Sequence, residues 1–369
     1  MKNSTQSTIG RILRLAVCLT AAFLCGVPAG ADSLYVEERK ATELAPGVYT
    51  IRHKDPFPGW VNGNTTVVIG EREVLVVDSC QFSYFAQEDI AQIRQWTSKP
   101  VRWLVNTHWH EDHNSGNRDY MEAWPGLAIL AHPATRAMLA DTAPHYASDV
   151  MRDAAPVREK LVKRLETGKM EDGQALTDET RARTKARIAQ IDQVIAATKN
   201  YSFQLPTATV DHEMRIDLGE REARVMFLGR GNTAGDLVVW LPKEKIVMSG
   251  DLLVSPIPFT FDGYPVEWID TLEKLDRLDA TVIVPGHGEV MRDRTYLRLV
   301  AEMMRSVVAQ VHEQLRQNDD MPLADVKKAV DLKALREKFA GDDKNIAGFF
   351  DYGIGDKFVE LVYHEAKQR

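Results

Sequence analysis

Cysteine is scarce in this sequence, which has three among 369 residues. Cys18 and Cys25 lie in an N-terminal stretch that we expect to be removed, and this leaves Cys80 alone. A single thiol cannot form an internal disulfide, so the sequence predicts a fold without that covalent support. For Cys80 itself we favour a buried free thiol over a position beside the chemistry.

Long apolar runs are also lacking. The run from Leu15 to Gly26 has about a dozen residues, whereas a helix that spans a bilayer needs roughly 20. Three basic residues and no acid precede it, and the small residues Ala29-Gly30-Ala31 follow it. This pattern predicts a secretory signal peptide over residues 1–31 rather than a retained anchor. We therefore expect a periplasmic or secreted protein with no membrane partner after cleavage.

The chain has no run of basic residues. It carries 46 Lys and Arg against 53 Asp and Glu, a formal net charge of −7. An acidic chain of this kind argues against nucleic acid or an anionic membrane as the partner. Because export also favours a compound met outside the cytoplasm, we expect a small-molecule substrate. The length and the 44% hydrophobic content fit one large or two ordinary folded domains.

Segments rich in β-branched residues alternate with segments of helical spacing. We predict strands at 48–53, 65–69, 72–78, 101–105, 127–131, 224–228, 236–241, 246–248 and 281–284. A helical pattern follows the third of these strands, and another passes through Trp268, Leu272 and Leu275. Strands that alternate with helices indicate an α/β protein.

Residues 133–200 differ in character from this pattern, because they are charged, rich in alanine and poor in aromatics. Ile188, Ile191 and Ile195 have helical spacing, and Thr177 before two acids is typical of a helix start. We predict a helical insertion, which covers or shapes a pocket, within a core domain of residues 32–290. Residues 291–369 are predicted to form a C-terminal helical extension.

The segment from Asn106 to Gly116 carries the most chemical information. Three histidines and an aspartate fall within six residues of it, as His108-x-His110-x-Asp112-His113, directly after the apolar strand 101–105. A strand that ends in a turn presents such side chains at a sheet edge. Imidazole and carboxylate are the ligands that zinc prefers in open, water-bearing sites. The sequence therefore predicts a zinc site at this edge.

The His108-x-His110-x-Asp112-His113 segment resembles the signature of the metallo-β-lactamase-fold hydrolase superfamily. Asp78 resembles the superfamily's first motif, a structural acid beneath the site. Gly250-Asp251-Leu252 resembles the fourth motif, and Pro285-Gly286-His287-Gly288 resembles the fifth. The resemblance covers roughly residues 45–290, and it implies an αββα sandwich with metals at one edge of the packed sheets.

The resemblance also implies a ligand set, which is carried over position by position. His108 and His110 would bind a first zinc ion. Asp112, His113 and His287 would bind a second, with Asp251 close to both. Asp112 would in addition be the catalytic residue that orients the attacking water.

One position departs from the superfamily pattern. Asn232, in the segment 229–236, stands where the third motif normally has a histidine ligand. An amide oxygen is a weaker zinc ligand than imidazole, so three outcomes stay open: Asn232 ligates, a water fills the place, or only the second metal is retained. We expect one or two zinc ions, held with unequal affinity when there are two.

The remaining histidines are not predicted to take part. Four of them are interpreted as surface or packing residues: His53, His145, His312 and His364. His132 is expected to be a satisfied histidine at a strand end. His212 lies on a different predicted segment, and its spacing gives no reason for it to replace the missing ligand.

These residues predict a zinc-dependent hydrolase. Zinc lowers the pKa of a bound water toward neutrality and so supplies a nucleophile without a Ser or Cys. Amides, esters, lactones and thioesters all remain candidate substrates, because fold does not fix function. A β-lactamase-like activity is among them, although Asn232 leads us to expect weak or absent β-lactam turnover. Two alternatives are an iron-dependent oxidoreductase on the same fold and a metal-binding protein without catalysis.

Overall fold

The computed structural model describes residues 36–56, 60–199, 201–261 and 263–368. The predicted signal peptide, residues 1–31, lies outside the described residues. Among the residues that are described, no helix combines the length and the apolar character needed to cross a membrane.

The first of two sheets has seven strands, hydrogen-bonded in chain order. They are β1 Lys40–Ala45, β2 Val48–Arg52, β3 Thr65–Ile69, β4 Val74–Val77, β5 Val101–Val105, β6 Ala128–Ala131 and β7 Ala208–Thr209. The strands β1 to β4 pair antiparallel, and β4 to β7 pair parallel. Parallel neighbours need a crossover, and α3, Ser83–Trp96, supplies the one between β4 and β5.

The second sheet has five strands in the order β12-β11-β10-β9-β8. They are β8 Glu213–Asp217, β9 Glu222–Phe227, β10 Leu237–Leu241, β11 Ile246–Val254 and β12 Val282–His287. Only the β11–β12 pair of this sheet is parallel, and α8, Pro265–Asp276, makes that crossover.

The two sheets face each other across a central apolar core. Every residue of β4 is buried, with Leu75 and Val77 in the central core and Val74 and Val76 on the outer face. In β10, Val239 likewise points to the central core while its neighbours point outward. Successive side chains of a strand alternate between faces, so strands buried on both sides read as continuous hydrophobic runs.

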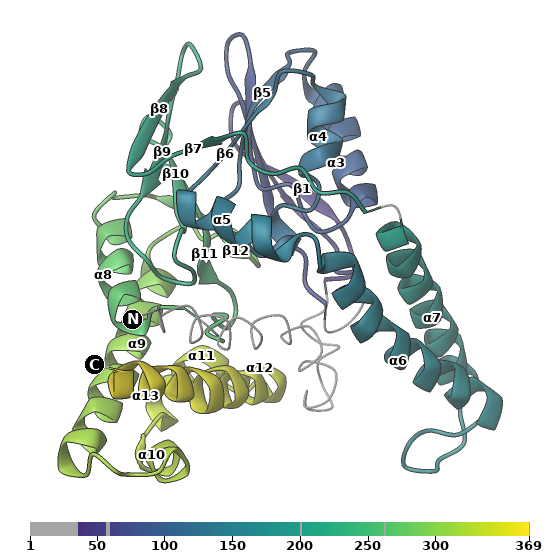
Figure 1. The fold of residues 1–369 in the computed structure, drawn as a ribbon, viewed down its shortest axis with the longest axis vertical. Coiled ribbons are helices and arrows are strands. Elements are labelled where there is room, and N and C mark those ends of the chain that lie inside the picture. The colour runs from purple at the N-terminus through teal and green to yellow at the C-terminus, as the bar shows by residue number, and fades with distance from the viewer. Residues whose placement is uncertain (1–35, 57–59, 200, 262, 369) are drawn as a thin grey trace, which may run out of the picture.

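Helices cover the outer face of each sheet (Figure 1). The first sheet is covered by α3, α4 Asn117–Ala123, α6 Tyr146–Thr167 and α7 Asp178–Lys199. The second is covered by α8, α9 Thr295–Gln317 and the C-terminal elements α10 Leu323–Ala329, α11 Lys333–Ala340, α12 Lys344–Phe350, η3 Asp351–Phe358 and α13 Val359–Gln368. The predicted αββα sandwich is thereby confirmed.

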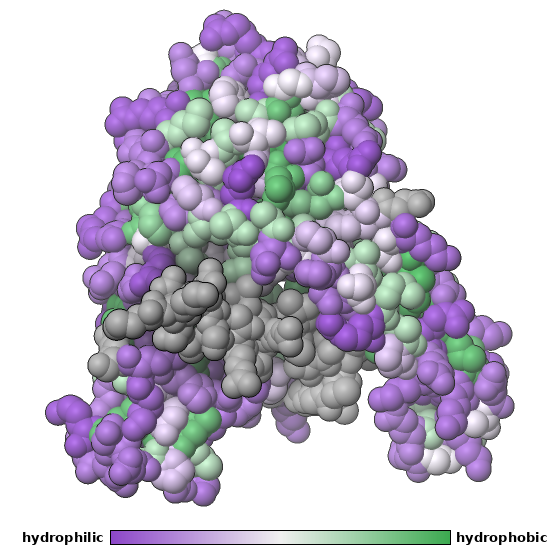
Figure 2. All heavy atoms as spheres, viewed as in Figure 1, coloured by the Kyte–Doolittle hydropathy of each residue, from purple (hydrophilic) through white to green (hydrophobic). Residues whose placement is uncertain are grey.

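Residues 133–199 are mostly helical, as the sequence predicts. They form α5, Pro133–Thr142, and the antiparallel pair α6 and α7, whose far ends project from the body of the molecule (Figure 1). The Thr177 hydroxyl accepts the Thr180 N–H at 3.1 Å, which caps the start of α7. The surface of this pair is mostly hydrophilic in the same view (Figure 2).

Three strands were not predicted, and two extend well beyond their predicted ends. β7 has only two residues, both exposed, and β8 has the single buried residue Ile216, so neither carries a run of apolar side chains. β1 is likewise exposed or half-buried throughout. β11 continues past Met248 to Val254, and β12 continues past Val284 to His287, because pairing between them extends through Gly250 and Pro285. The predicted domain boundaries stay a prediction.

Candidate metal centre

The loop that follows β5 carries four of the predicted ligands. A short 3₁₀ turn, Glu111–His113, folds the loop back on itself. The side-chain amide of Asn114 donates to the carbonyl oxygen of His110 at 2.6 Å, which closes the turn. Asn106 and Asn117 exchange side-chain hydrogen bonds of 2.9 and 2.8 Å beneath it. The loop is therefore held in one shape by amide contacts that are themselves buried.

The structure brings His108, His110 and Asp251 together as one group. The Nε2 of His108 lies 3.0 Å from the Nδ1 of His110 and 3.7 Å from the Oδ2 of Asp251. His108 and Asp251 are buried. The resemblance assigns His108 and His110 to a first metal, and Asp251 is the aspartate that it places close to both metals.

Asp112, His113 and His287 form a second group. The Nε2 of His287 lies 3.0 Å from the Nε2 of His113 and 3.0 Å from the Oδ2 of Asp112. The Oδ1 of Asp251 lies 3.3 Å from the Nε2 of His113. Asp251 thus turns one carboxylate oxygen toward each group.

The spacing of these atoms fits a divalent cation. Zinc–nitrogen bonds of about 2.05 Å in a tetrahedral site place neighbouring ligand atoms about 3.3 Å apart. The separations among His113, His287, Asp112 and Asp251 run from 3.0 to 3.6 Å. Buried imidazoles and carboxylates that converge on one point need a cation to compensate them, and a zinc ion suits this donor set.

Charges in the cluster push the histidine pKa values in opposite directions. Burial, with the neighbouring imidazoles, lowers the pKa of His108 well below its usual range. Burial also lowers the pKa of His113, but the carboxylates of Asp112, Asp251 and Asp78 outweigh it and raise that pKa well above its usual value. The same negative potential that holds a proton on His113 would attract a metal ion, and metal binding would release the proton.

Asp78 supports the cluster from below. It follows β4, is buried, and accepts the Thr107 N–H at 2.8 Å and the Thr107 hydroxyl at 2.9 Å. Its Oδ2 also lies 2.9 Å from the Nδ1 of His113. A carboxylate on one ring nitrogen fixes the tautomer that presents the other nitrogen, Nε2, to the cluster.

Two glycines leave room for the ligands. A Cβ at Gly63 would lie 2.6 Å from the His113 ring, and a Cβ at Gly286 would lie 1.8 Å from the Oδ1 of Asp251. Asn64, next to Gly63, donates its side-chain amide to the carbonyls of Pro285 and Gly288 at 2.9 and 3.0 Å. The turn at 62–64 therefore packs against both the His113 and the His287 loops.

Asn232 is buried, and its two amide atoms differ in their surroundings. Its Nδ2 donates to the Phe259 carbonyl at 2.9 Å, whereas its Oδ1 is buried without a hydrogen-bond donor among the described residues. Asp236 holds the same turn by accepting the Thr233 N–H and hydroxyl at 2.9 and 2.7 Å. An unpaired buried acceptor is costly, which is consistent with an additional partner for Oδ1.

The other histidines lie outside the cluster. His212 is exposed, at 89% of its side chain, and His132 caps α5 by accepting the Ala134 N–H at 3.2 Å. His53 is buried, and its Nε2 lies 3.1 Å from the Oδ2 of Asp89. Cys80 is buried, as predicted, and burial raises the pKa of its thiol well above its usual value.

Two residues near the cluster were not singled out from the sequence. Asp55 accepts the backbone N–H groups of Val36 and Asn62 at 3.0 and 3.1 Å, and burial raises its pKa to about 7. The ring centroid of Phe259 lies 5.2 Å from that of His287. Both belong to segments without a regular pattern, so no motif marks them.

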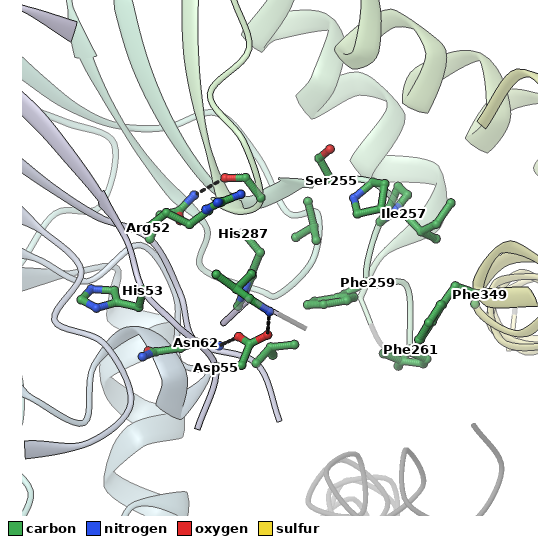
Figure 3. A pocket seen from close by; sticks show the side chains of 18 of the residues that line it. Arg52, His53, Asp55, Asn62, Ser255, Ile257, Phe259, Phe261, His287 and Phe349 are labelled. Atoms are coloured by element: carbon green, nitrogen blue, oxygen red, sulfur yellow. Dashed lines mark hydrogen bonds between the residues drawn. The ribbon is translucent and has the colours of Figure 1, made fainter. Parts of the chain in front are cut away.

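A pocket lies beside His287 and encloses about 890 Å³ of space, part of it open to solvent. In Figure 3, Asp55 and Asn62 lie on one side of the pocket, and Phe259, Phe261 and Phe349 lie on the other. Phe349 belongs to α12, so the C-terminal helices contribute to this pocket. The insertion at 133–200, which we expected to shape a pocket, contributes no lining residue to this one.

Parts of this sequence are similar to known proteins. A linear primary-alkylsulfatase of Pseudomonas sp. (strain ATCC 19151) is 26% identical over 251 residues, which cover 65% of this chain and 44% of that protein. A metallo-β-lactamase type 2 of Bacillus cereus is 28% identical over 98 residues, 25% of this chain and 38% of that protein. In both pairings the match spans less than half of the relative's length.

Solved structures give the same fold. A metallo-β-lactamase from Pontibacter korlensis superposes with a TM-score of 0.52 at 18% identity, covering 73% of this chain and 99% of that one. The sequence profile described as the metallo-beta-lactamase superfamily matches residues 58–287, well over half of the chain. With its αββα sandwich and its histidine–aspartate cluster at the sheet edge, this chain belongs to the metallo-β-lactamase superfamily.

Proposed function

We propose that this chain is a zinc-dependent hydrolase that cleaves an amide, ester, lactone or thioester of a small molecule with an activated water. The observation that carries the proposal is the convergence of the two groups, His108/His110/Asp251 and Asp112/His113/His287, on adjacent points. The relatives named above include an alkylsulfatase and β-lactamases, which are hydrolases, and this supports a metal-dependent hydrolase in general terms.

Zinc, when bound, would supply a Lewis acid that lowers the pKa of water and polarises the scissile group. The roles of the protein residues follow from their surroundings. Asp112 has the accessible carboxylate of the cluster, with 14% of its side chain exposed, against 2% for Asp251. Burial raises the pKa of Asp112, but the charges of His113 and His287 outweigh it and hold that pKa well below its usual range. It can therefore accept a hydrogen bond from the attacking water and orient it.

The Asn232 position favours unequal binding of two zinc ions. Its amide oxygen is neutral and buried, and it stands where the superfamily has an imidazole. We propose that the Asp112/His113/His287 group binds more tightly than the His108/His110 group. Zinc counted per chain after mild dialysis tests this, because two equally retained ions would contradict it.

A sulfate ester is a second candidate substrate. The alkylsulfatase match covers 65% of this chain, against 25% for the B. cereus β-lactamase. The same activated water would serve, with sulfur in place of carbon as the atom attacked. We still expect weak or absent β-lactam turnover. For the location of the protein, we propose the periplasm or the outside of the cell.

The test is a substrate panel run on zinc-loaded protein. We expect hydrolysis of at least one of p-nitrophenyl butyrate, p-nitrophenyl sulfate, a thioester and a lactone, lost with a chelator and restored by zinc. A chromogenic cephalosporin tests the β-lactam expectation, which turnover comparable to dedicated resistance enzymes would contradict. Iron content would identify the oxidoreductase alternative. Protein that retains zinc but hydrolyses nothing on the panel would favour the binding protein without catalysis.

A further inference from the structure

The pocket beside His287 is walled in part by the C-terminal helices. The geometry points to a binding site for the apolar alkyl or aryl group of a substrate whose scissile bond lies at the metal centre, with residues 349–353 setting specificity. This inference rests on the proposed function, because it takes the metal centre as the place of reaction. The C-terminal helices would then take part in binding the substrate as well as in covering the second sheet.

A row of aromatic rings leads from the cluster to the C-terminal helices. Between ring centroids, the distance is 5.2 Å from His287 to Phe259, 6.2 Å from Phe259 to Phe261, and 6.0 Å from Phe261 to Tyr352. All three side chains line the pocket and are half-buried. An apolar chain that entered along this row would bury these rings further, which is favourable by the hydrophobic effect.

The helical wall is fixed rather than loosely placed. Phe350 and Ile354, on either side of the lining residues, are fully buried in the outer core. The Thr260 hydroxyl donates to the Gly353 carbonyl at 3.1 Å and joins the segment that carries Phe259 and Phe261 to η3. The π-helical geometry of η3 is itself uncommon, and such stretches occur frequently at functional sites.

The distribution of charge selects the kind of occupant. Polar lining residues such as Asp55, Asn62 and Asn64 gather near His287, where a scissile group would lie. Arg52, the cationic lining residue, is paired with Glu289. Val254, Ile257 and the aromatic row make most of the remaining wall apolar. The pocket therefore suits an amphiphilic small molecule, with its polar end at the cluster and its apolar end against the C-terminal helices.

The experiment measures binding rather than turnover. Zinc-loaded protein is titrated calorimetrically with n-alkanoates from butanoate to decanoate, whose carboxylate resembles a hydrolysis product. We expect Kd to fall by up to about fourfold for each added CH₂, because each buried methylene contributes a roughly constant free energy. Phe261→Ala and Phe349→Ala are expected to flatten this dependence while leaving butanoate binding within about twofold.

Leu361→Ala is the matched control, since Leu361 packs against the same outer core as Phe349 but does not line the pocket. It should retain the wild-type dependence on chain length. A wild-type affinity independent of chain length would overturn the inference, and so would a dependence that survives in the Phe261→Ala/Phe349→Ala double variant. Chain-length dependence without any hydrolysis would refute the proposed function and leave the pocket standing. Hydrolysis without chain-length dependence would do the reverse.

Discussion

Replacing Asp78 by asparagine should separate metal affinity from fold stability. The carboxylate accepts from Thr107 through both oxygens, and its Oδ2 also faces the Nδ1 of His113. In the Asp78→Asn variant the amide oxygen can keep the Thr107 N–H. The NH₂ group, however, then faces Nδ1 of His113 and favours the tautomer with its proton on Nε2. That proton occupies the lone pair which the cluster needs for a metal.

The two expected magnitudes differ. Loss of a hydrogen-bonding partner that orients a metal ligand typically reduces metal affinity by about 10- to 100-fold, or about 1.4 to 2.7 kcal/mol. The metal-free fold should lose less than about 2 kcal/mol. The reason is that burial raises the pKa of Asp78 despite its hydrogen bonds, so its charge does not stabilise the folded state.

Zinc affinity is measured by competition with a chromophoric chelator, and stability by urea unfolding of the chelated protein. Asp119→Asn is the matched control, because Asp119 accepts from Ser83 at 2.6 Å and Gln87 at 3.3 Å, away from the cluster. The control should bind zinc as the wild type does. Zinc affinity within twofold of wild type in Asp78→Asn, together with a large loss of stability, would show that Asp78 only braces the fold and would refute this reasoning.

Three further changes test other parts of the site. Asn232→His restores an imidazole, so two zinc ions should survive dialysis, and an unchanged zinc count would count against the asymmetry. Asp112→Ala should lower chelator-sensitive hydrolysis by about 100-fold or more, whereas His212→Ala, at an exposed position, should not; equal rates would remove Asp112 from the mechanism. Burial raises the pKa of Asp236 to about 7, so its ionisation costs free energy of folding as the pH rises from about 4 to 7. Urea unfolding of metal-free protein should therefore show the wild type losing stability relative to Asp236→Asn, by at most about 4 kcal/mol, and a gap independent of pH would contradict this.

Two strands match the sequence prediction at both ends. These are β3 and β5, and they match because their β-branched and apolar residues are bounded by turns and loops. β8 escapes prediction because a single buried residue, Ile216, gives no periodic signal. β8 is the edge strand of its sheet and forms by pairing with β9, the next strand along the chain. Its place there depends on that pairing rather than on a run of apolar side chains.

The candidate cluster was accessible from the sequence for a different reason. Histidines and an aspartate at short spacing after a strand, as from His108 to His113, indicate a metal site whatever the rest of the fold is. The pocket carries no comparable signal, because Asn62, Phe259, His287 and Phe349 come from segments far apart in the chain. Nothing local in any one of them reveals that they share a cavity.

The Asn232 substitution links these two parts of the site. Its Nδ2 donates to the carbonyl of Phe259, the first ring of the aromatic row, while its Oδ1 has no donor among the described residues. By the superfamily pattern, an imidazole at this position would give a nitrogen to the metal. The ring would have to reorient to keep a hydrogen bond to the Phe259 carbonyl. We therefore expect Asn232→His to gain zinc and, in the same protein, to weaken the dependence of alkanoate binding on chain length. If zinc retention rose and the chain-length dependence stayed at its wild-type value, the hydrogen bond to Phe259 would have no part in shaping the pocket.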